Sequence, residues 1–333
     1  MSAVKKQHQS KNRIMKGQET HMGKIDTRTH EYLKDNTRFA DIVNYYIYDG
    51  KQIIDPSKLQ ELDPVEITFP HKKGRSSEII QKSRDLLKKA CVMQDEKATY
   101  LIIGIENQAE VQYAMPVKNL LYDAEQYSKQ VSATSKRHKA EKDKKRISSG
   151  EFLSGFYKDD KLIPVITIVV YWSPDKWNGP LTLHDMFGEN DPDVMRFIPN
   201  YRINLIEPYD LDDEDFNKLK TDLAKVLKYI KYSNQKESLQ MIVHNDMFYE
   251  EVDRETVELL NDVAGAGIKI EESEDHINMN KAMEDIKKES EDNKAIEIAK
   301  ALLTRGKDTI EDISEITKLP IEVIQGLAEP SVQ

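Results

Sequence analysis

The sequence contains few of the residues that mark secreted, zinc-binding or membrane-spanning proteins. Cys91 is the single cysteine among 333 residues, which excludes an intramolecular disulfide framework and a zinc site built from several cysteines. The longest apolar run, Leu162–Trp172, is interrupted by Pro164 and is too short to cross a bilayer. Residues Met1–His21 are polar and basic and lack the apolar centre of a signal peptide. We therefore expect a cytoplasmic protein without a membrane segment, and a disordered basic extension over residues 1–21.

Patterns for common cofactor sites are missing as well. The sequence has no glycine-rich P-loop and no dinucleotide-binding fingerprint. The histidines are His8, His21, His30, His71, His138, His184, His244 and His276. Because they do not follow the spacing of metal ligands, we expect them in surface or core positions.

Acidic residues outnumber basic ones, with 59 Asp and Glu against 49 Lys and Arg, for a net charge of −10. An acidic total argues against a general nucleic-acid binder, because Lys and Arg neutralise phosphates. One segment departs from this balance, since residues 129–146 carry eight basic side chains and two acidic ones. The basic residues are Lys129, Lys136, Arg137, Lys139, Lys142, Lys144, Lys145 and Arg146. The segment has two interpretations, a solvated surface or a DNA-phosphate contact.

Two apolar segments separated by an amphipathic helix predict the centre of an α/β sheet. Tyr100–Ile105 and Leu162–Tyr171 are rich in branched residues, which is typical of buried central strands. Between them, a helical stripe begins at Met115-Pro116. The order strand, helix, strand favours a parallel crossover. A further helix over Lys34–Tyr48 is predicted before this sheet, and Tyr201–Ile206 is a candidate edge strand.

The pattern from Asp212 onward is largely helical. One helix is predicted to carry the apolar residues from Phe216 to Ile230, and a pair of short helices is predicted over Ile310–Ile316 and Ile321–Leu327. This last pair could be a helix-turn-helix that reads DNA, but proline at the start of a helix is common, and the pattern favours packing or assembly into a homo-oligomer.

Polar residues at the end of the first central strand form a candidate site. Glu106 and Gln108 point to one face because side chains alternate along a strand. If residues 84–93 are a strand joined through a turn at 94–97, Asp85 lies opposite Glu106, with Cβ atoms about 4.5 to 5.5 Å apart. Two close carboxylates suit Mg²⁺ or Mn²⁺. Two alternatives remain open: residues 84–93 also fit a helix, and Glu106 and Gln108 could simply end the strand in a solvated turn.

Several of these features, taken in order, resemble the recombination-promoting nuclease (Rpn) family, whose members are also described as transposases and belong to the PD-(D/E)XK nuclease superfamily. The resemblance covers roughly residues 22–205. The features are Asp85, the strand Tyr100–Ile105, Glu106-Asn107-Gln108, Met115-Pro116-Val117-Lys118 with Tyr122 and Tyr127, and the strand Ile163–Tyr171. The resemblance implies a restriction-endonuclease-like mixed sheet flanked by helices, with an appended helical C-terminal region.

The resemblance also implies roles for individual residues. Asp85 and Glu106 match the metal-binding acids of the superfamily, and Gln108 stands where lysine is usual, so slower chemistry or a second cation is expected. The superfamily places a further metal-binding acid on the first core helix, for which Asp41 is our candidate and Asp35 the reserve. Gln126 is a candidate accessory residue. The implied domains are a nuclease core over 22–206, a helical subdomain over 207–275 and a helical region over 276–333.

The sequence therefore predicts a Mg²⁺- or Mn²⁺-dependent DNA endonuclease, acting in recombination, mobile-element biology or defence against foreign DNA. Asp85, Glu106 and Gln108 are its predicted catalytic residues. Residues Lys136, Arg137, Lys139, Lys144, Lys145 and Arg146 are its predicted DNA contacts. The alternative is a nuclease fold with little or no activity that binds nucleic acid or a protein partner.

Overall fold

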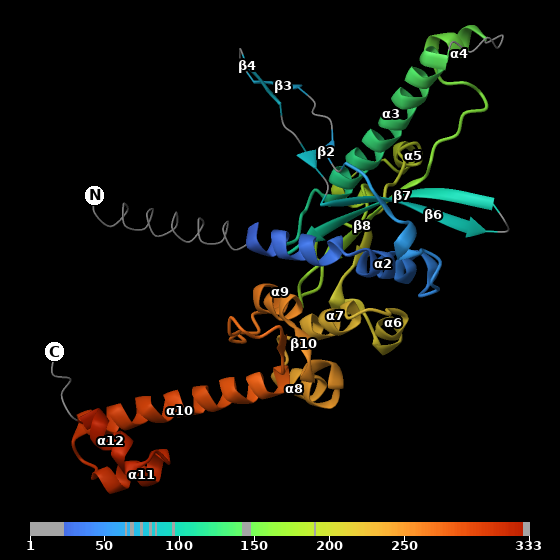
Figure 1. The fold of residues 1–333 in the computed structure, drawn as a ribbon. Helices are drawn as coiled ribbons and strands as arrows, with labels where there is room; N and C mark the ends of the chain where they lie inside the picture. Colours follow the sequence, from blue (N-terminus) through green and yellow to red (C-terminus); the bar gives the residue numbers. More distant parts are fainter. Residues whose placement is uncertain are drawn as a thin grey trace. The chain divides into compact units, whose positions relative to one another are not determined.

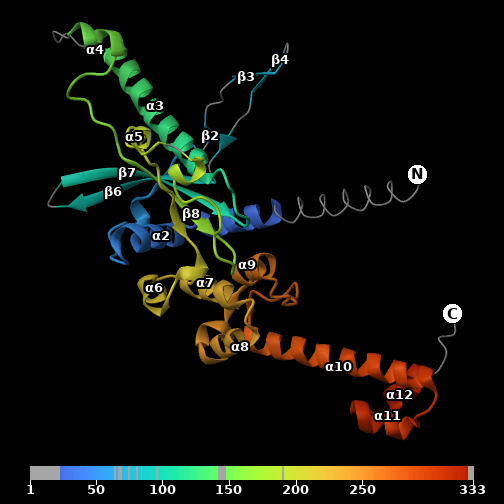
Figure 2. The same ribbon diagram turned by 180° about the vertical axis from the view of Figure 1, so that it is seen from behind.

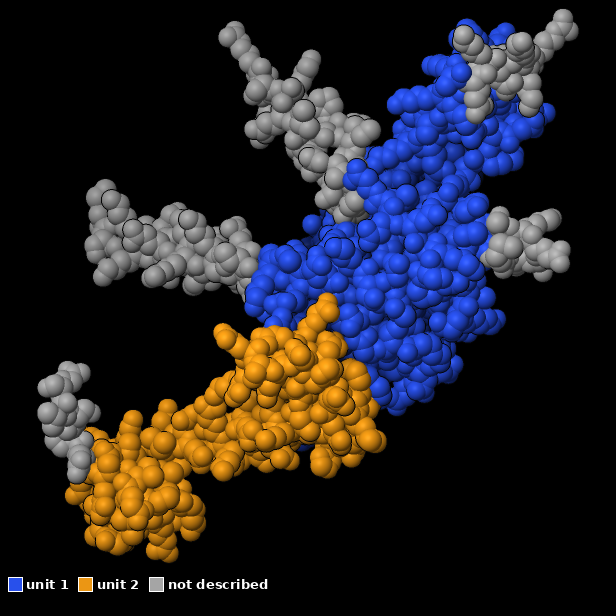
Figure 3. Space-filling view, in the orientation of Figure 1, with its two compact units in different colours: residues 1–239, 258–266 blue, residues 240–257, 267–333 orange. Residues whose placement is uncertain are grey.

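The structure is a computed structural model that describes residues 23–63, 65–66, 70–73, 76–79, 82–83, 85–94, 97–141, 148–189 and 191–328. The predicted extension over residues 1–21 lies outside these described residues. The chain divides into two compact units, Met1–Leu239 with Glu258–Ala266 and Gln240–Val257 with Gly267–Gln333 (Figure 3). This division differs from the predicted boundaries at 206 and 275, because residues 207–239 pack with the sheet-containing unit.

A mixed sheet forms the centre of the first unit (Figure 1). Its described strands are β1 (Gln60–Glu61), β6 (Leu86–Gln94), β7 (Lys97–Gln108), β8 (Val165–Tyr171) and β9 (Asn204–Ile206). Among the described residues they form a five-stranded sheet in the order β1-β6-β7-β8-β9. β6 pairs antiparallel with β1 and β7, whereas β7, β8 and β9 run parallel. The predicted parallel crossover and edge strand are confirmed.

Helices cover both faces of this sheet. α2 (Asn36–Tyr48) and α3 (Met115–Glu141) lie on opposite sides of it in both views (Figures 1 and 2). Tyr127 of α3 packs against Leu87, Ile102 and Val165 of the sheet. Because side chains alternate along β7, Glu106 lies on the same face as Ile102, and it is therefore directed towards α3.

A helix over residues 23–34 precedes α2 and is anchored to the sheet by a buried lysine. Lys88 of β6 donates hydrogen bonds from Nζ to the backbone oxygen of Lys34 and to Oδ1 of Asn36, both at 2.6 Å. Burial lowers the pKa of Lys88. The lysine satisfies a carbonyl at the end of the helix, where backbone acceptors lack partners within the helix itself. This contact fixes the helix that carries Asp26 and His30.

The single helix predicted from Phe216 to Ile230 is wrong, because the structure breaks it into two. The two helices are α6 (Asp213–Lys218) and α7 (Leu223–Tyr232). Between them, the backbone N–H groups of Lys220 and Thr221 donate to the carboxylate of Asp41 in α2. Leu219 and Leu223 on the two sides of the break are both buried, so the apolar pattern continues across it.

Shorter elements lie before residue 236 in the first unit, which also contains Glu258–Ala266. They are β2 (Val65–Glu66) paired with β5 (Lys82–Ser83), β3 (Pro70–Lys73) paired with β4 (Ser76–Ile79), α4 (Ser149–Ser154), α5 (Pro192–Met195), and 3-10 turns at Pro56–Lys58, His184–Met186 and Pro208–Asp210. α4 lies at the far end of α3 in both views (Figures 1 and 2).

The rest of the chain is mainly helical. Its elements are α8 (Lys236–Asn245), a 3-10 turn at Met247–Glu250, β10 (Val252–Asp253) paired with β11 (His276–Ile277), α9 (Arg254–Ala264), α10 (Met279–Arg305), α11 (Ile310–Thr317) and α12 (Ile321–Ala328). A small core of Ala299, Ile313, Leu319 and Ile324 joins α10, α11 and α12. The predicted helical C-terminal region is confirmed, and so is the overall fold class. Every helix that the structure describes is too short or too polar to span a bilayer.

Candidate functional site

The register of β6 and β7 brings two predicted acids together. Leu86 pairs with Ile105, and the antiparallel pairing continues to Gln94 and Lys97. Asp85, the residue before this ladder, therefore lies across from Glu106. Its Oδ2 accepts a hydrogen bond from the backbone N–H of Asn107 at 2.6 Å. The strand interpretation of this segment is confirmed and its helical alternative is wrong.

Glu106 is fully buried and is held by a lysine from α3. Nζ of Lys118 donates a hydrogen bond to Oε2 of Glu106 at 2.6 Å. Lys118 lies in the first turn of α3, and its ammonium is also 5.6 Å from the ring centre of Tyr122, one helical turn further on. This arrangement places a positive charge at the end of β7, where the neutral Gln108 supplies no charge.

The electrostatic environment of Asp85 includes groups from a second helix. Burial is the largest cause that raises the pKa of Asp85, and the carboxylate of Asp26 raises it further. The backbone hydrogen bond from Asn107, together with the charges of Lys118 and His30, acts in the opposite direction. Burial likewise raises the pKa of Asp26, against the effect of Lys118. The helix over residues 23–34 therefore supplies an acid and a histidine close to Asp85.

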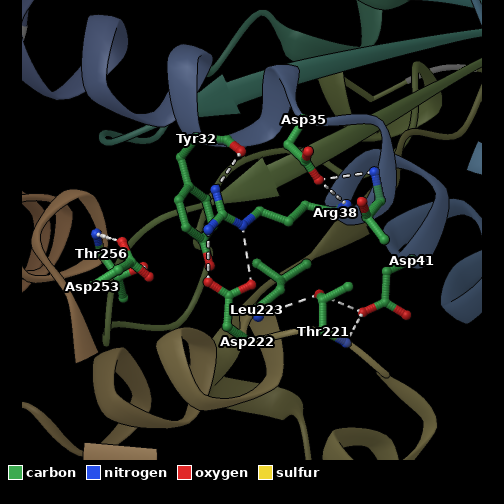
Figure 4. Close-up of polar contacts among 10 residues, drawn as sticks. Tyr32, Asp35, Arg38, Asp41, Thr221, Asp222, Leu223, Asp253 and Thr256 are labelled. Atoms are coloured by element: carbon green, nitrogen blue, oxygen red, sulfur yellow. Dashed lines mark hydrogen bonds and ion pairs between the residues drawn. The ribbon is translucent and has the colours of Figure 1, made fainter. Parts of the chain in front are cut away.

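Asp41, the predicted metal-binding acid of the first core helix, contacts the segment between α6 and α7 (Figure 4). Its side chain is 2% exposed and accepts hydrogen bonds from the backbone N–H groups of Lys220 and Thr221 and from the Thr221 hydroxyl. These donors occupy both carboxylate oxygens. The reserve candidate, Asp35, caps α2 by accepting hydrogen bonds from the backbone N–H groups of Thr37 and Arg38. The contacts of Asp41 and Asp35 therefore stabilise the fold.

Gln108 and Gln126 lie at different distances from the paired acids. Nε2 of the half-buried Gln108 donates a hydrogen bond to the backbone oxygen of Asn107 at 2.7 Å, so this side chain stays at the strand end. Gln126 is buried on α3. It follows Lys118 by eight residues, which places it about 12 Å further along the helix axis. The geometry therefore favours Gln108 as a neighbour of Glu106.

The basic segment continues along α3, away from the acids. Lys136, Arg137 and Lys139 are exposed on this helix. Lys136 follows Lys118 by 18 residues, or about 27 Å of helix. The other predicted DNA contacts, Lys144, Lys145 and Arg146, lie outside the described residues. The described part of the basic segment is thus a surface separate from the acid pair, on the same helix.

The donor set can be compared with the needs of a divalent cation. In the described ranges, no three His, Cys, Asp or Glu side chains gather as a metal cluster. Asp85 and Glu106 supply carboxylate oxygens, the ligand type that Mg²⁺ and Mn²⁺ prefer. The pKa of Asp85 is raised, and a nearby cation has the opposite effect on a carboxylate. The two acids therefore offer the type of oxygen ligand that such an ion takes.

One comparison with known proteins decides the family. A family model with the description "Putative transposase, YhgA-like" matches residues 75–258, more than half of the chain. The chain belongs to this family. Because the YhgA-like transposases are the Rpn family of PD-(D/E)XK proteins, the resemblance seen in the sequence is confirmed. No curated protein and no solved structure matches this chain.

The family match covers one of the two groups of acids and not the other. It includes Asp85, Glu106, Gln108 and Lys118 but not Asp41 or the helix over residues 23–34. Lys118 is not among the functional residues predicted from the sequence, although the helix start that contains it is. The available signal was the spacing of Lys118 and Tyr122, which puts a cation and an aromatic ring on the same side of the helix start.

Proposed function

We propose that this protein hydrolyses phosphodiester bonds in DNA with a Mg²⁺ or Mn²⁺ ion held by Asp85 and Glu106. The observation that carries the proposal is the pairing of these two acids across β6 and β7, with Lys118 on Glu106 at 2.6 Å. Opposed carboxylates beside a half-buried lysine are costly for a purely structural role, since each buried charge must be compensated. Membership of a transposase family supports DNA as the substrate.

Each residue has a distinct task in this proposal. Asp85 and Glu106 hold the ion, and Lys118 fixes the carboxylate of Glu106 and supplies positive charge at the place where Gln108 has none. Gln108 orients a water molecule or a phosphate oxygen through its amide. When bound, a divalent ion polarises the phosphoryl oxygen and lowers the pKa of its water, which is the chemistry that phosphodiester hydrolysis requires.

The exposed basic residues of α3 give this proposal a DNA-binding surface. Lys136, Arg137 and Lys139 would contact phosphates and give affinity without sequence information. We therefore assign the protein to DNA cleavage in recombination, in mobile-element biology or in defence against foreign DNA, as the sequence predicts.

The test is plasmid cleavage by the full chain. Supercoiled plasmid is incubated with the wild type in Mg²⁺, in Mn²⁺ and in EDTA, beside Glu106→Gln and Glu110→Gln. Glu110 is an exposed acid four residues further along the chain, which makes it a matched control. We expect nicking by the wild type and by Glu110→Gln in metal only, and none by Glu106→Gln.

Two outcomes of the plasmid assay would contradict the proposal. If the wild type binds plasmid but does not cut it in either metal, the enzyme proposal fails and the alternative of a DNA-binding module takes its place. If Glu106→Gln cuts as fast as the wild type, the metal site lies elsewhere.

A further inference from the structure

Two large apolar side chains are exposed to solvent near the end of α3. Phe152 is 74% exposed and Leu153 is 84% exposed, and both belong to the short helix α4. Figures 1 and 2 show α4 at the end of α3 that is remote from the sheet. Exposed neighbouring apolar side chains on an otherwise polar surface commonly mark a binding site. We call α4, residues 129–141 of α3 and the return segment 155–163 the arm.

The return segment of the arm is tied to α3 along its length. Gln130 exchanges two hydrogen bonds with the backbone of Ile163, at 2.7 and 3.0 Å. The ring of His138 stacks on Tyr157 with ring centres 3.7 Å apart, and its Nε2 lies 2.8 Å from Oδ2 of Asp160. These contacts join the two sides of the arm, so α4 sits on a built support.

The orientation of α4 is fixed at both of its ends. At its start, Ser148 and Glu151 form a capping box, in which each side chain accepts a hydrogen bond from the other residue's backbone N–H. At its end, Gly155 has φ +66° and lies so close to α3 that a Cβ atom there would be 2.1 Å from Oγ of Ser135. Phe152 and Leu153 are therefore held outward by the fold itself.

The charge of the arm identifies its partner. Lys136, Arg137 and Lys139 are exposed on the part of α3 that belongs to the arm, and Arg137 also lies 3.8 Å from Asp160 in an ion pair, in a protein whose net charge is −10. A second copy of the chain fits the tip poorly. Two side chains bury at most about 400 Å², whereas a stable dimer needs about 800 Å² on each partner. A polyanion that also offers apolar surfaces between its stacked bases matches both features.

We propose that the arm is a wedge for distorted DNA: Phe152 and Leu153 insert beside an unpaired or unstacked base while Lys136, Arg137 and Lys139 hold the neighbouring phosphates. The inference rests on DNA being the substrate of the proposed function. Insertion of Phe and Leu between base steps costs a few kcal/mol of stacking, and this cost is smallest where a base is already unpaired. The arm therefore selects bulged or mismatched duplexes.

α3 carries Lys118 in its first turn and the arm at its other end. Its length therefore sets the distance between the acid pair and the wedge. Arg137 follows Lys118 by 19 residues, or about 28 Å of α3. A duplex lying along α3 passes about eight base pairs over that length, at about 3.4 Å for each step of a strand. We therefore expect cleavage within about eight base pairs of the distortion.

The test measures binding in EDTA, so that it does not depend on cleavage. A duplex with one bulged base, and 2-aminopurine beside the bulge, is compared with the fully paired duplex. The proteins are the wild type, the double variant Phe152→Ser with Leu153→Ser, and Met247→Ser as a control. Met247 is 79% exposed and lies outside the arm. All three substitutions remove exposed side chains, so each variant is expected to fold.

We expect the wild type and Met247→Ser to bind the bulged duplex at least about tenfold more tightly than the paired one, with a rise in 2-aminopurine fluorescence. The double variant should lose the preference and the fluorescence rise while keeping its affinity for paired DNA. Replacing Lys136, Arg137 and Lys139 by Gln should instead weaken binding to both duplexes and reduce the salt dependence.

Three results would overturn the wedge. The first is equal affinity of the wild type for both duplexes, and the second is a preference that survives in the double variant. The third is a wild-type dimer that the double variant splits in sedimentation, since the tip would then be a self-association surface. A wild type that cuts plasmid without a bulge preference refutes only the wedge, whereas a bulge preference without cutting refutes only the proposed catalysis.

Discussion

Two aspartates of the first unit, Asp41 and Asp85, differ in the number of hydrogen-bond donors around their carboxylates. Asp41 accepts hydrogen bonds on both oxygens from the segment between α6 and α7 (Figure 4). Within the described residues, Asp85 accepts one, from the backbone N–H of Asn107. Burial raises the pKa of Asp85. A carboxylate surrounded by donors stabilises the fold, whereas one with few donors keeps the capacity to bind a cation.

The strongest test of this comparison is Asp85→Asn. Loss of a carboxylate ligand removes several kcal/mol of transition-state stabilisation, so plasmid nicking should fall at least about 100-fold. The free energy of unfolding should stay equal to that of the wild type or rise, because the amide avoids the cost of burying a charge. Initial nicking rates and urea unfolding of the same preparation check both parts. Normal nicking by a folded Asp85→Asn protein would remove Asp85 from the site.

The opposite pattern is expected of Asp41→Asn. One oxygen of the carboxylate becomes an NH₂ group that cannot accept from the backbone N–H groups of Lys220 and Thr221. The loss of charge-assisted hydrogen bonds in a buried position should lower the free energy of unfolding by about 3 kcal/mol. Nicking by the folded fraction should remain within about twofold of the wild type. A stable Asp41→Asn protein that fails to cut DNA would reverse the assignment of the two acids.

The sequence allowed the position of Asp85 to be predicted because the information is local. A four-residue turn between two apolar segments fixes the register, and register decides which side chains are opposed. The ladder from Leu86 and Ile105 to Gln94 and Lys97 agrees with that reasoning. Glu106 and Gln108 follow from the alternation along β7.

The contacts of Asp41 could not be predicted from the sequence, because its partners are remote. Lys220 and Thr221 are about 180 residues away in the chain, and no helical periodicity reveals which backbone N–H groups will face a given acid. The same contact breaks the helix predicted from Phe216 to Ile230. Asp26, which lies near Asp85, is on the exposed side of a helix that buries Ile25, Tyr32 and Leu33, and its position in the sequence does not distinguish it from other surface acids.

Lys118 was missed for a related reason, and its removal sharpens the comparison. Lys118→Met leaves the fully buried Glu106 without its ammonium partner, which should lower the free energy of unfolding by about 2 kcal/mol. The value is below the usual range for a buried pair because the Lys118 side chain is 27% exposed. Nicking should also fall. Urea unfolding and plasmid assays measure the two effects.

A double-mutant cycle separates the ion pair from other effects of Lys118→Met. If the lysine acts on Glu106, the loss of stability should largely disappear when Glu106→Gln is added, because the partner charge is then absent. Additive losses in the cycle would show that Lys118 stabilises the fold through its contact with Tyr122.

The pH dependence of stability gives the smallest effect and tests the environment of Asp85 directly. Since burial raises the pKa of Asp85 in the folded state above the ordinary value of 3.8, the folded protein binds more protons than the unfolded chain between these two pKa values. Stability attributable to Asp85 is therefore lost as the pH rises through that window. Asp85→Asn should match the wild type at the acidic end and become relatively more stable above it. Mg²⁺ should then stabilise the wild type but not the variant, because metal binding requires the deprotonated carboxylate. Urea midpoints from about pH 3.5 to 7.5, with and without Mg²⁺, would measure both, and identical curves for the two proteins would contradict the raised pKa.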